Sequence, residues 1–224
     1  CLERNYFRII SSAATRERDK FHINKNLTTN IELTDVTDKY CVFGLFGPKS
    51  RELISSVSKE DFSNKNFKFA TGKKVKINNV DTWVQRLSYV GELGYEIYVE
   101  FDKAVEIYGL VINEGKKYNI SNCGMHSLDI MRMENGFLHW GHDISPEENQ
   151  YQAGLEFAIS FKKNVNFIGK NSLLEIKDSK INKRLIMFKL QDTKPGEPLL
   201  LHDEPIYLDK KIIGRTTSGN YSFN

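Results

Sequence analysis

The sequence has few cysteines, and their spacing suggests neither disulfide pairing nor metal binding. Its 224 residues include only Cys1, Cys41 and Cys123, with no CxxC motif among them. An odd number of thiols without that motif fits a reducing compartment better than a disulfide framework or a zinc site. His139 and His142 form a close pair, but no cysteine or further histidine lies at ligand spacing beside them. The sequence therefore predicts no metal site.

Long apolar runs, a charge excess, repeats and low-complexity segments are also missing. No apolar stretch approaches the roughly 18 residues that a membrane span needs, and the first residues show no secretory pattern. The net charge of +3 is small, and the basic residues occur as pairs rather than blocks. Such a distribution argues against a nucleic-acid or membrane surface. We therefore expect neither a nucleic-acid nor a membrane partner.

The patterns that are present predict an α+β protein. Apolar residues make up 40% and charged residues 27% of the chain, ordinary values for a globular protein, and the length suits one large domain or two small ones. Strand, helix, strands and helix follow one another over residues 40–135, which predicts an antiparallel sheet with helices packed on one side. Short strands with proline and glycine turns near the end of the chain predict a small β-barrel or sandwich.

The individual elements follow from apolar periodicity and from end signals. Residues 40–46 form a continuous apolar run, which predicts a fully buried strand. Pro48 suits the first turn of a helix, and Asp102 suits an N-cap. The expected strands cover residues 6–11, 31–36, 40–46, 67–77, 81–88, 95–101, 184–190, 205–208 and 211–215. The expected helices cover residues 14–20, a segment after Pro48, a segment after Asp102, and residues 125–134 and 169–177.

Residues 89–101, YVGELGYEIYVEF, organise this pattern. Alternation predicts a half-buried strand with Tyr95, Ile97, Val99 and Phe101 on one face. Just before it, two glycines bracket Glu92, so that the backbone there can turn sharply and approach a ligand. A carboxylate on such a turn can accept two parallel hydrogen bonds, as the edge of a pterin or a guanidinium would donate them. The alternative is a solvated acidic hairpin tip.

Arg132 is the second residue of interest. It lies four positions after Leu128 on the predicted helix, on or beside the apolar stripe. An arginine there needs an acceptor, because an unpaired buried charge is very costly. It could form a structural ion pair with Asp129 or Glu134, or hold an anionic or carbonyl-bearing ligand. Nearby Trp140 could stack on a planar ligand or belong to the core.

Six segments together carry a resemblance to a known family. They occur in the order YVGELGYEIYV (residues 89–99), MRMENG (131–136), WGHD (140–143), AGLEF (153–157), FIGK (167–170) and TTSGNYS (216–222). This series resembles the folate-binding glycine-cleavage T-protein family, and is most similar to the C-terminal half of dimethylglycine and sarcosine dehydrogenases. The resemblance covers nearly the whole chain from Tyr6.

The resemblance implies a tetrahydrofolate site and one-carbon chemistry. In that family the glutamate of the GExGYE turn and the arginine of the following helix contact folate or bound substrate, and they match Glu92 and Arg132. Aromatic residues around the pterin would be Tyr89 and Tyr95. The partners implied are folate and an iminium derived from a methylated glycine. Capture of this iminium to give methylenetetrahydrofolate requires close positioning and exclusion of water, since a free iminium hydrolyses to formaldehyde.

Departures from the family pattern suggest an internal fragment of a longer enzyme. The folate-binding α+β domain and the β-barrel domain that follows it would both be incomplete. The family's catalytic aspartate would lie upstream of Cys1, so the catalytic residue is unknown here. A flavin-binding domain, with any FAD, would lie further upstream, and no dinucleotide fingerprint occurs in this chain. Leu128 stands where T-proteins often carry an arginine. The expected division is the tail of an upstream α+β subdomain (1–38), a folate-binding α+β domain (39–160) and the start of a β-barrel domain (161–224).

Two alternatives to a dehydrogenase-type folate domain remain open. One is a stand-alone aminomethyltransferase of glycine cleavage, which would need a lipoyl-protein partner. The other is a non-catalytic interaction module with the same fold, as in a regulatory subunit of a phosphatase. The expected location is the cytoplasm, or the mitochondrial matrix as the alternative.

Overall fold

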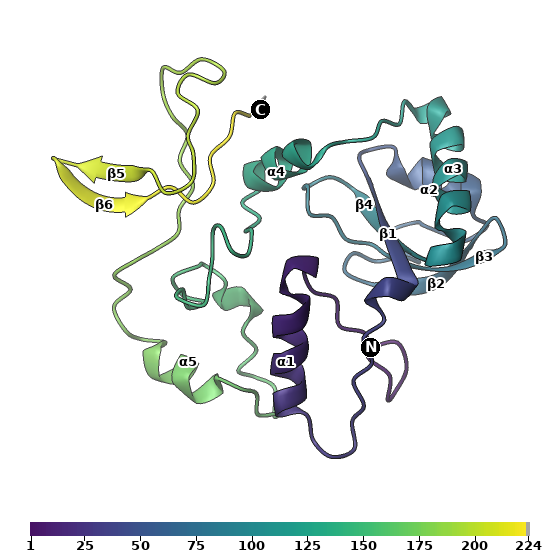
Figure 1. Ribbon diagram of the computed structural model, residues 1–224, viewed down its shortest axis with the longest axis horizontal. Helices are drawn as coiled ribbons and strands as arrows, with labels where there is room; N and C mark the ends of the chain where they lie inside the picture. The colour runs from purple at the N-terminus through teal and green to yellow at the C-terminus, as the bar shows by residue number, and fades with distance from the viewer. Residues whose placement is uncertain (223–224) are drawn as a thin grey trace.

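A four-stranded antiparallel sheet forms the centre of the computed structural model, which describes residues 1–222 (Figure 1). The strand order is β1-β4-β3-β2. The neighbours pair antiparallel, with Tyr40 opposite Glu100 and Val84 opposite Ile97. The strands are β1 (Tyr40–Phe46), β2 (Gly72–Ile77), β3 (Val80–Gln85) and β4 (Gly94–Glu100).

Two helices cover one face of this sheet and close the core. They are α2 (Ser50–Val57) and α3 (Ala104–Gly115), which pack against each other (Figure 1). Three apolar residues of α2 recur at helical spacing, as the sequence predicts, and all three are buried: Leu53, Ile54 and Val57. They meet the inward face of β4, where Tyr95, Ile97 and Val99 are fully buried. Burial of this continuous apolar surface is the main stabilising term for the domain.

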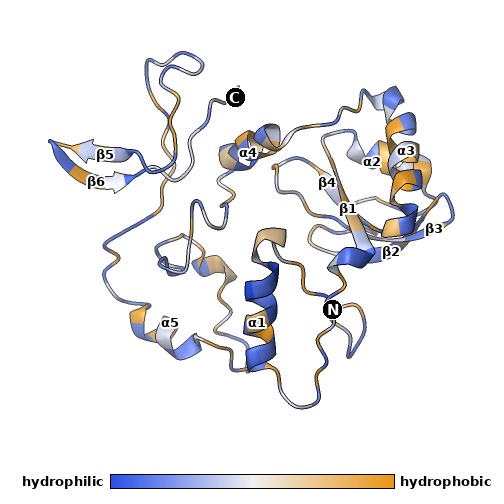
Figure 2. Ribbon diagram, viewed as in Figure 1, coloured by the Kyte–Doolittle hydropathy of each residue, from blue (hydrophilic) through white to orange (hydrophobic). Residues whose placement is uncertain are grey.

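The remaining elements lie beside the sheet rather than within it (Figure 1). The helices are α1 (Arg16–Asn26), α4 (Met125–Glu134) and α5 (Lys170–Ile176), and the strands are β5 (Pro205–Leu208) and β6 (Lys211–Arg215), which form a separate antiparallel pair. Short 3₁₀ helices cover Ala13–Thr15, Thr37–Lys39, Phe101–Lys103, Lys116–Tyr118 and Glu156–Ala158. Helix α1 is largely hydrophilic in Figure 2 and buries none of its residues.

Several sequence predictions are wrong in this structure. Residues 6–11, 31–36 and 184–190 form no strand, because no neighbouring strand pairs with their backbone. Residues 40–46 do form β1, but at an edge of the sheet, where Leu45 alone is buried. Asp102 lies inside a 3₁₀ turn, and the N-cap of α3 is Lys103. Phe101 also lies in that turn and is exposed rather than part of the buried face.

The mixed α+β class and the antiparallel sheet are confirmed, whereas the small barrel is not. Within residues 1–222, the C-terminal part holds one two-stranded sheet and no closed barrel. Among the same residues, no helix has the length and apolar character that crossing a membrane requires.

Candidate functional site

A surface cleft lies between the turn that precedes β4 and one face of α4. Its volume is about 510 Å³, and the turn and the helix each contribute one wall. The helical positions that line it follow the i, i+3, i+4, i+7 spacing of a single helix face. The lining residues are Val90, Gly91, Glu92, Ser127, Ile130, Met131, Glu134 and Asn135. The two segments that the sequence indicates as functional, GELGYE and MRMENG, therefore meet at one cleft.

Glu92 presents an exposed carboxylate to this cleft from a fixed turn. Its carboxylate has no hydrogen-bond or ion-pair partner among residues 1–222. The turn itself is anchored, because the Leu93 carbonyl accepts hydrogen bonds from the Gly47 amide (2.8 Å) and the Ser50 hydroxyl (3.1 Å). Gly91 has φ +75°, a conformation that L side chains rarely adopt. A rigid turn with an unpaired carboxylate can accept hydrogen bonds from a ligand that carries adjacent N–H groups.

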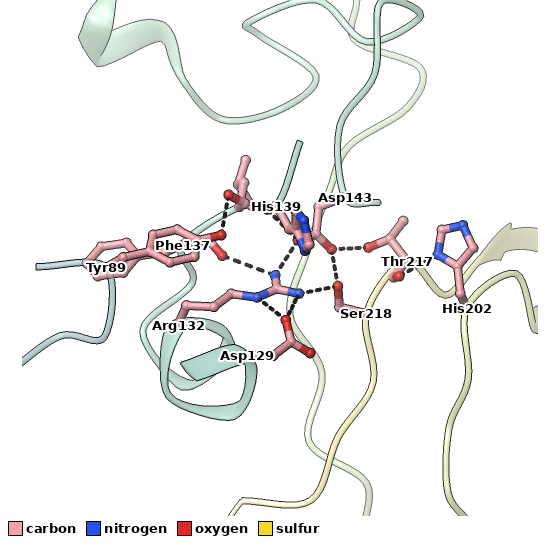
Figure 3. Close-up of polar contacts among 10 residues, drawn as sticks. Tyr89, Asp129, Arg132, Phe137, His139, Asp143, His202, Thr217 and Ser218 are labelled. Carbon is pink, nitrogen blue, oxygen red and sulfur yellow. Dashed lines mark hydrogen bonds and ion pairs between the residues drawn. The ribbon is translucent and has the colours of Figure 1, made fainter. Parts of the chain in front are cut away.

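Arg132 is rotated off the cleft face of α4 and lies at the centre of a buried polar cluster (Figure 3). Its side chain is 3% exposed, and its guanidinium donates to Asp129 (2.8 Å), to Asp143, to the Ser218 hydroxyl (2.6 Å) and to the Phe137 carbonyl (3.2 Å). An ion pair with Asp129 is one of the alternatives that the sequence leaves open. Asp143 is the further partner, and it comes from the WGHD turn. In this arrangement the guanidinium faces acceptors of the chain itself.

Asp143 joins three separate parts of the chain. Its carboxylate accepts hydrogen bonds from the hydroxyls of Thr217 (2.6 Å) and Ser218 (2.7 Å) and from the His139 amide (2.8 Å). Burial alone raises the pKa of the Asp143 carboxyl, but these hydrogen bonds and the charge of Arg132 outweigh it. The pKa therefore lies below its ordinary value, and the carboxylate stays ionised. The cluster fixes the TTSG segment against α4 through charge-assisted hydrogen bonds.

The two tyrosines named by the sequence lie in different surroundings. Tyr89 is half-buried beside the cleft turn, where its hydroxyl donates to the Leu138 carbonyl (2.9 Å) and its ring stacks on Phe137 with centroids 6.2 Å apart. Burial raises the pKa of the Tyr89 hydroxyl. Tyr95 is 0% exposed and packs edge-on against Phe62 in the core. The structure thus brings Tyr89 and Glu92 to one turn, while Tyr95 lies behind it.

Sequence reasoning missed several residues that shape this region. Glu134, which the sequence suggests only as an ion-pair partner of Arg132, lines the cleft together with Asn135. The i, i+7 relation of Ser127 to Glu134 on one helix face is the signal that could have indicated this position. Thr217 and Ser218 bind Asp143 across 74 and 75 residues of sequence. No local pattern predicts such a contact.

Acidification is expected to weaken the Asp143 cluster. Since the folded pKa of Asp143 lies below its ordinary value of about 3.9, the unfolded chain takes up the proton first. The resulting stabilisation is complete above about pH 4 and is lost as the pH falls through the lower folded pKa. Urea unfolding of the parent chain and of Asp143→Asn at several pH values should show a stability difference that shrinks below about pH 4. A difference that stays constant down to pH 3 would contradict this assignment.

No metal centre is formed by the part of the chain that the structure describes. His139 and His142 have ring centroids 4.4 Å apart, and His202 lies 5.4 Å from His142. Even so, no group of three or more His, Cys, Asp or Glu side chains within residues 1–222 is placed to hold a metal ion.

Comparison with known proteins places this chain in a family. Residues 1–163 match the family described as "GCVT N-terminal domain". The chain is 39% identical over 187 residues to 4-methylaminobutanoate oxidase (formaldehyde-forming) of Paenarthrobacter nicotinovorans, covering 84% of this chain and 22% of that protein. It is 34% identical over 197 residues to mitochondrial dimethylglycine dehydrogenase of Homo sapiens, covering 87% of this chain and 22% of that protein.

Aminomethyltransferases are similar over a longer stretch of the chain. The protein of Halothermothrix orenii is 30% identical over 223 residues, 99% of this chain and 60% of that protein. The crystal structure of glycine cleavage system aminomethyltransferase T from Bartonella henselae aligns with a TM-score of 0.61 at 20% identity, covering 74% of this chain and 44% of that one. That likeness supports the fold. The chain spans about a fifth of the length of its oxidase and dehydrogenase relatives.

The family match covers well over half of the chain, and the relatives include both oxidising enzymes and aminomethyltransferases. The chain therefore belongs to the GCVT N-terminal domain family, with the aminomethyltransferase-type fold.

Proposed function

We propose that this chain is the tetrahydrofolate-binding, one-carbon transfer domain of an enzyme similar to dimethylglycine or sarcosine dehydrogenase. The observation that carries the proposal is the unpaired Glu92 carboxylate, held on a rigid turn at the mouth of the cleft. The edge of a pterin offers adjacent N–H donors, and a carboxylate that accepts two of them forms strong, directional hydrogen bonds.

The cleft suits such a ligand in size and lining. A volume of about 510 Å³ falls within the range of roughly 300–1,000 Å³ typical of small-molecule sites. Ile130 and Met131 supply apolar surface for a flat ring, while Glu92 supplies an acceptor. A reduced folate, when bound, supplies a nucleophilic amine that takes up the one-carbon unit. The role of this chain's residues is to orient that ring and to keep water from the reacting groups.

The other predicted site residues receive roles that follow their positions. Tyr89 forms the aromatic side of the turn, through its stacking on Phe137 and its hydrogen bond to Leu138. Arg132 is proposed to act by fixing α4 to the WGHD turn, since its donors are directed at Asp129, Asp143 and Ser218. Tyr95 is proposed to support the turn from the core.

Calorimetric titration of 5-formyltetrahydrofolate, a stable reduced folate, into the chain tests this function. We expect saturable binding that weakens by roughly 10- to 100-fold in Glu92→Gln, because a charge-assisted hydrogen-bond pair is lost. Glu100→Gln is the matched control, since Glu100 is exposed at the far end of β4, the strand that follows the Glu92 turn. Equal losses in both variants would remove Glu92 from the site. Absence of binding by the parent chain would favour a non-catalytic interaction module.

A stand-alone aminomethyltransferase is the second candidate, favoured by the alignment over 99% of the chain with such an enzyme. It would take its one-carbon unit from an aminomethyl group carried on a lipoyl protein, whereas the dehydrogenase type would receive it from a methylated amine oxidised by a flavin domain. The full-length enzyme that contains this chain would be supplied with each donor in turn, and the methylenetetrahydrofolate formed would be measured. The donor that gives product distinguishes the aminomethyltransferase from the dehydrogenase type. We also propose the division of the chain into the tail of an upstream subdomain (1–38), a folate-binding domain (39–160) and the start of a β-barrel domain (161–224).

A further inference from the structure

Three exposed histidines lie where the C-terminal segment meets the WGHD turn. His142 belongs to the turn and His139 immediately precedes it, and their ring centroids are 4.4 Å apart. His202 lies in the segment before β5, and its ring meets the ring of His142 edge-on, with centroids 5.4 Å apart. Two segments that are far apart in the sequence therefore bring their imidazole rings together.

Thr217 is held between these two segments (Figure 3). Its hydroxyl donates to Asp143 of the WGHD turn (2.6 Å), and its carbonyl lies 2.6 Å from Nδ1 of His202. Because a carbonyl can only accept a hydrogen bond, Nδ1 of His202 must carry a proton. We call these two contacts of Thr217, with Asp143 and with His202, the clasp. The clasp fixes residues 216–218 to the WGHD turn.

Most charged groups around the clasp are already paired with one another. They are the ion pairs Arg132–Asp143, Arg132–Asp129, Arg215–Asp203 and Arg18–Asp19, together with Glu204, whose carboxylate accepts the Leu201 amide. Within residues 1–222, the rings of His139 and His142 have no ion-pair or hydrogen-bond partner. Nε2 of His202 lies 3.2 Å from Asp203. A proton on His202 is therefore compensated by a carboxylate, whereas a proton on His142 is not.

Acid places like charges on both sides of the clasp. An imidazole ordinarily takes up a proton near pH 6.5, so the rings gain charge as the pH falls toward 5.5. Two unit charges at the separations of these rings disfavour each other by roughly fourfold in water. His142 takes part in both close pairs, so its protonation is opposed from two sides. Moving the segment that carries His202 away from the turn relieves the repulsion between His142 and His202.

We propose that the three histidines make the clasp acid-responsive: between pH 7.5 and 5.5, repulsion between His142 and His202 releases residues 216–218 from the WGHD turn. The Asp143 carboxylate stays ionised over this range, because its pKa lies below the ordinary value of about 3.9. The response is therefore distinct from the loss of the Asp143 cluster below about pH 4. This inference goes beyond the proposed function and does not depend on it.

Hydrogen–deuterium exchange of peptides that cover residues 216–218 tests the clasp. After correction for the intrinsic effect of pH, exchange in the parent chain should rise about tenfold between pH 7.5 and 5.5, because two repulsive contacts of roughly fourfold each act together. Peptides from β4 should show no such rise. His142→Gln removes the ring shared by both contacts and should limit the rise to about twofold. His22→Gln, at an exposed position on α1, is the matched control and should respond as the parent chain does.

A second variant and a change of salt separate charge repulsion from other causes. His202→Ala should raise exchange of residues 216–218 by about two- to tenfold already at pH 7.5, because the hydrogen bond to the Thr217 carbonyl is lost. In 1 M NaCl the Debye length falls to about 3 Å, so the acid response of the parent chain should shrink. An acid response of equal size in the parent chain and in His142→Gln would overturn the inference. A response that 1 M NaCl leaves unchanged, or equal exchange at both pH values, would also overturn it.

Discussion

Replacing Arg132 with methionine is expected to lower the free energy of unfolding by about 3–5 kcal/mol. Methionine retains the length and apolar stem of the side chain but removes the charge, so Asp143, which is 5% exposed in its side chain, loses its counter-ion. A carboxylate left buried without a partner pays its full desolvation cost. The contact of α4 with Ser218 is lost at the same time. Urea unfolding monitored by the fluorescence of Trp140, in a Trp83→Phe background, measures this change beside the cluster.

Arg16→Met is the matched control for this prediction. Arg16 also bonds to two carboxylates, Asp35 and Asp38, at 2.8 Å each, but its side chain is 35% exposed. Solvent-exposed ion pairs are typically worth about 0–1 kcal/mol, so the control should lose little. Restoring part of the loss by combining Arg132→Met with Asp143→Asn would identify the uncompensated carboxylate as the cause. Equal losses in Arg132→Met and Arg16→Met would show that the buried cluster does not stabilise the fold.

Elements whose ends carry a local signal could be predicted from the sequence. Helix α4 has the predicted bounds, Met125–Glu134, because apolar residues recur at helical spacing and Gly136, with φ +67°, follows its end. The strands β5 and β6 also agree, since Pro205 begins the first and a turn at Asp209 and Lys210, both with positive φ, separates the two. The turn that carries Glu92 is also indicated locally, by two glycines followed by an alternating strand, and Glu92 lines the cleft.

Features that depend on distant residues could not be predicted in this way. Residues 6–11 and 184–190 have the composition of strands, but a strand requires a partner, and the sequence does not say whether one lies beside it. The position of β1 at the sheet edge depends on the strand order, which the alternation of apolar residues does not encode. The partners of Arg132 could not be predicted either, because Asp143 and Ser218 lie 11 and 86 residues further along the chain. The position of Arg132 on the apolar stripe of the helix indicates that it needs an acceptor, but it does not indicate which residue provides that acceptor.

Substitution of Tyr95 is the second change expected to have a large effect on stability. Two different substitutions distinguish a role in the core from a role in ligand binding. Its ring is 0% exposed and lies 5.5 Å from Phe62 and 5.8 Å from Phe67, measured between centroids. Tyr95→Ala should therefore lower the free energy of unfolding by about 3–5 kcal/mol, the loss typical of large aromatic residues truncated in a core. Tyr95→Phe removes a hydroxyl whose bond from Arg51 is long, at 3.4 Å, and should cost no more than about 1 kcal/mol.

Urea unfolding of Tyr95→Ala is compared with that of Tyr108→Ala, and folate titration of Tyr95→Phe is compared with that of the parent chain. Tyr108 is 40% exposed and contacts Phe43 from α3, so its truncation should cost clearly less than Tyr95→Ala. If the Tyr95 ring only supports the turn, Tyr95→Phe should bind 5-formyltetrahydrofolate as tightly as the parent chain. Loss of folate binding in Tyr95→Phe at unchanged stability would instead mean that the ligand reaches the Tyr95 hydroxyl. The sheet behind Glu92 would then have to open on binding, because Tyr95 is inaccessible while its ring packs against Phe62 and Phe67.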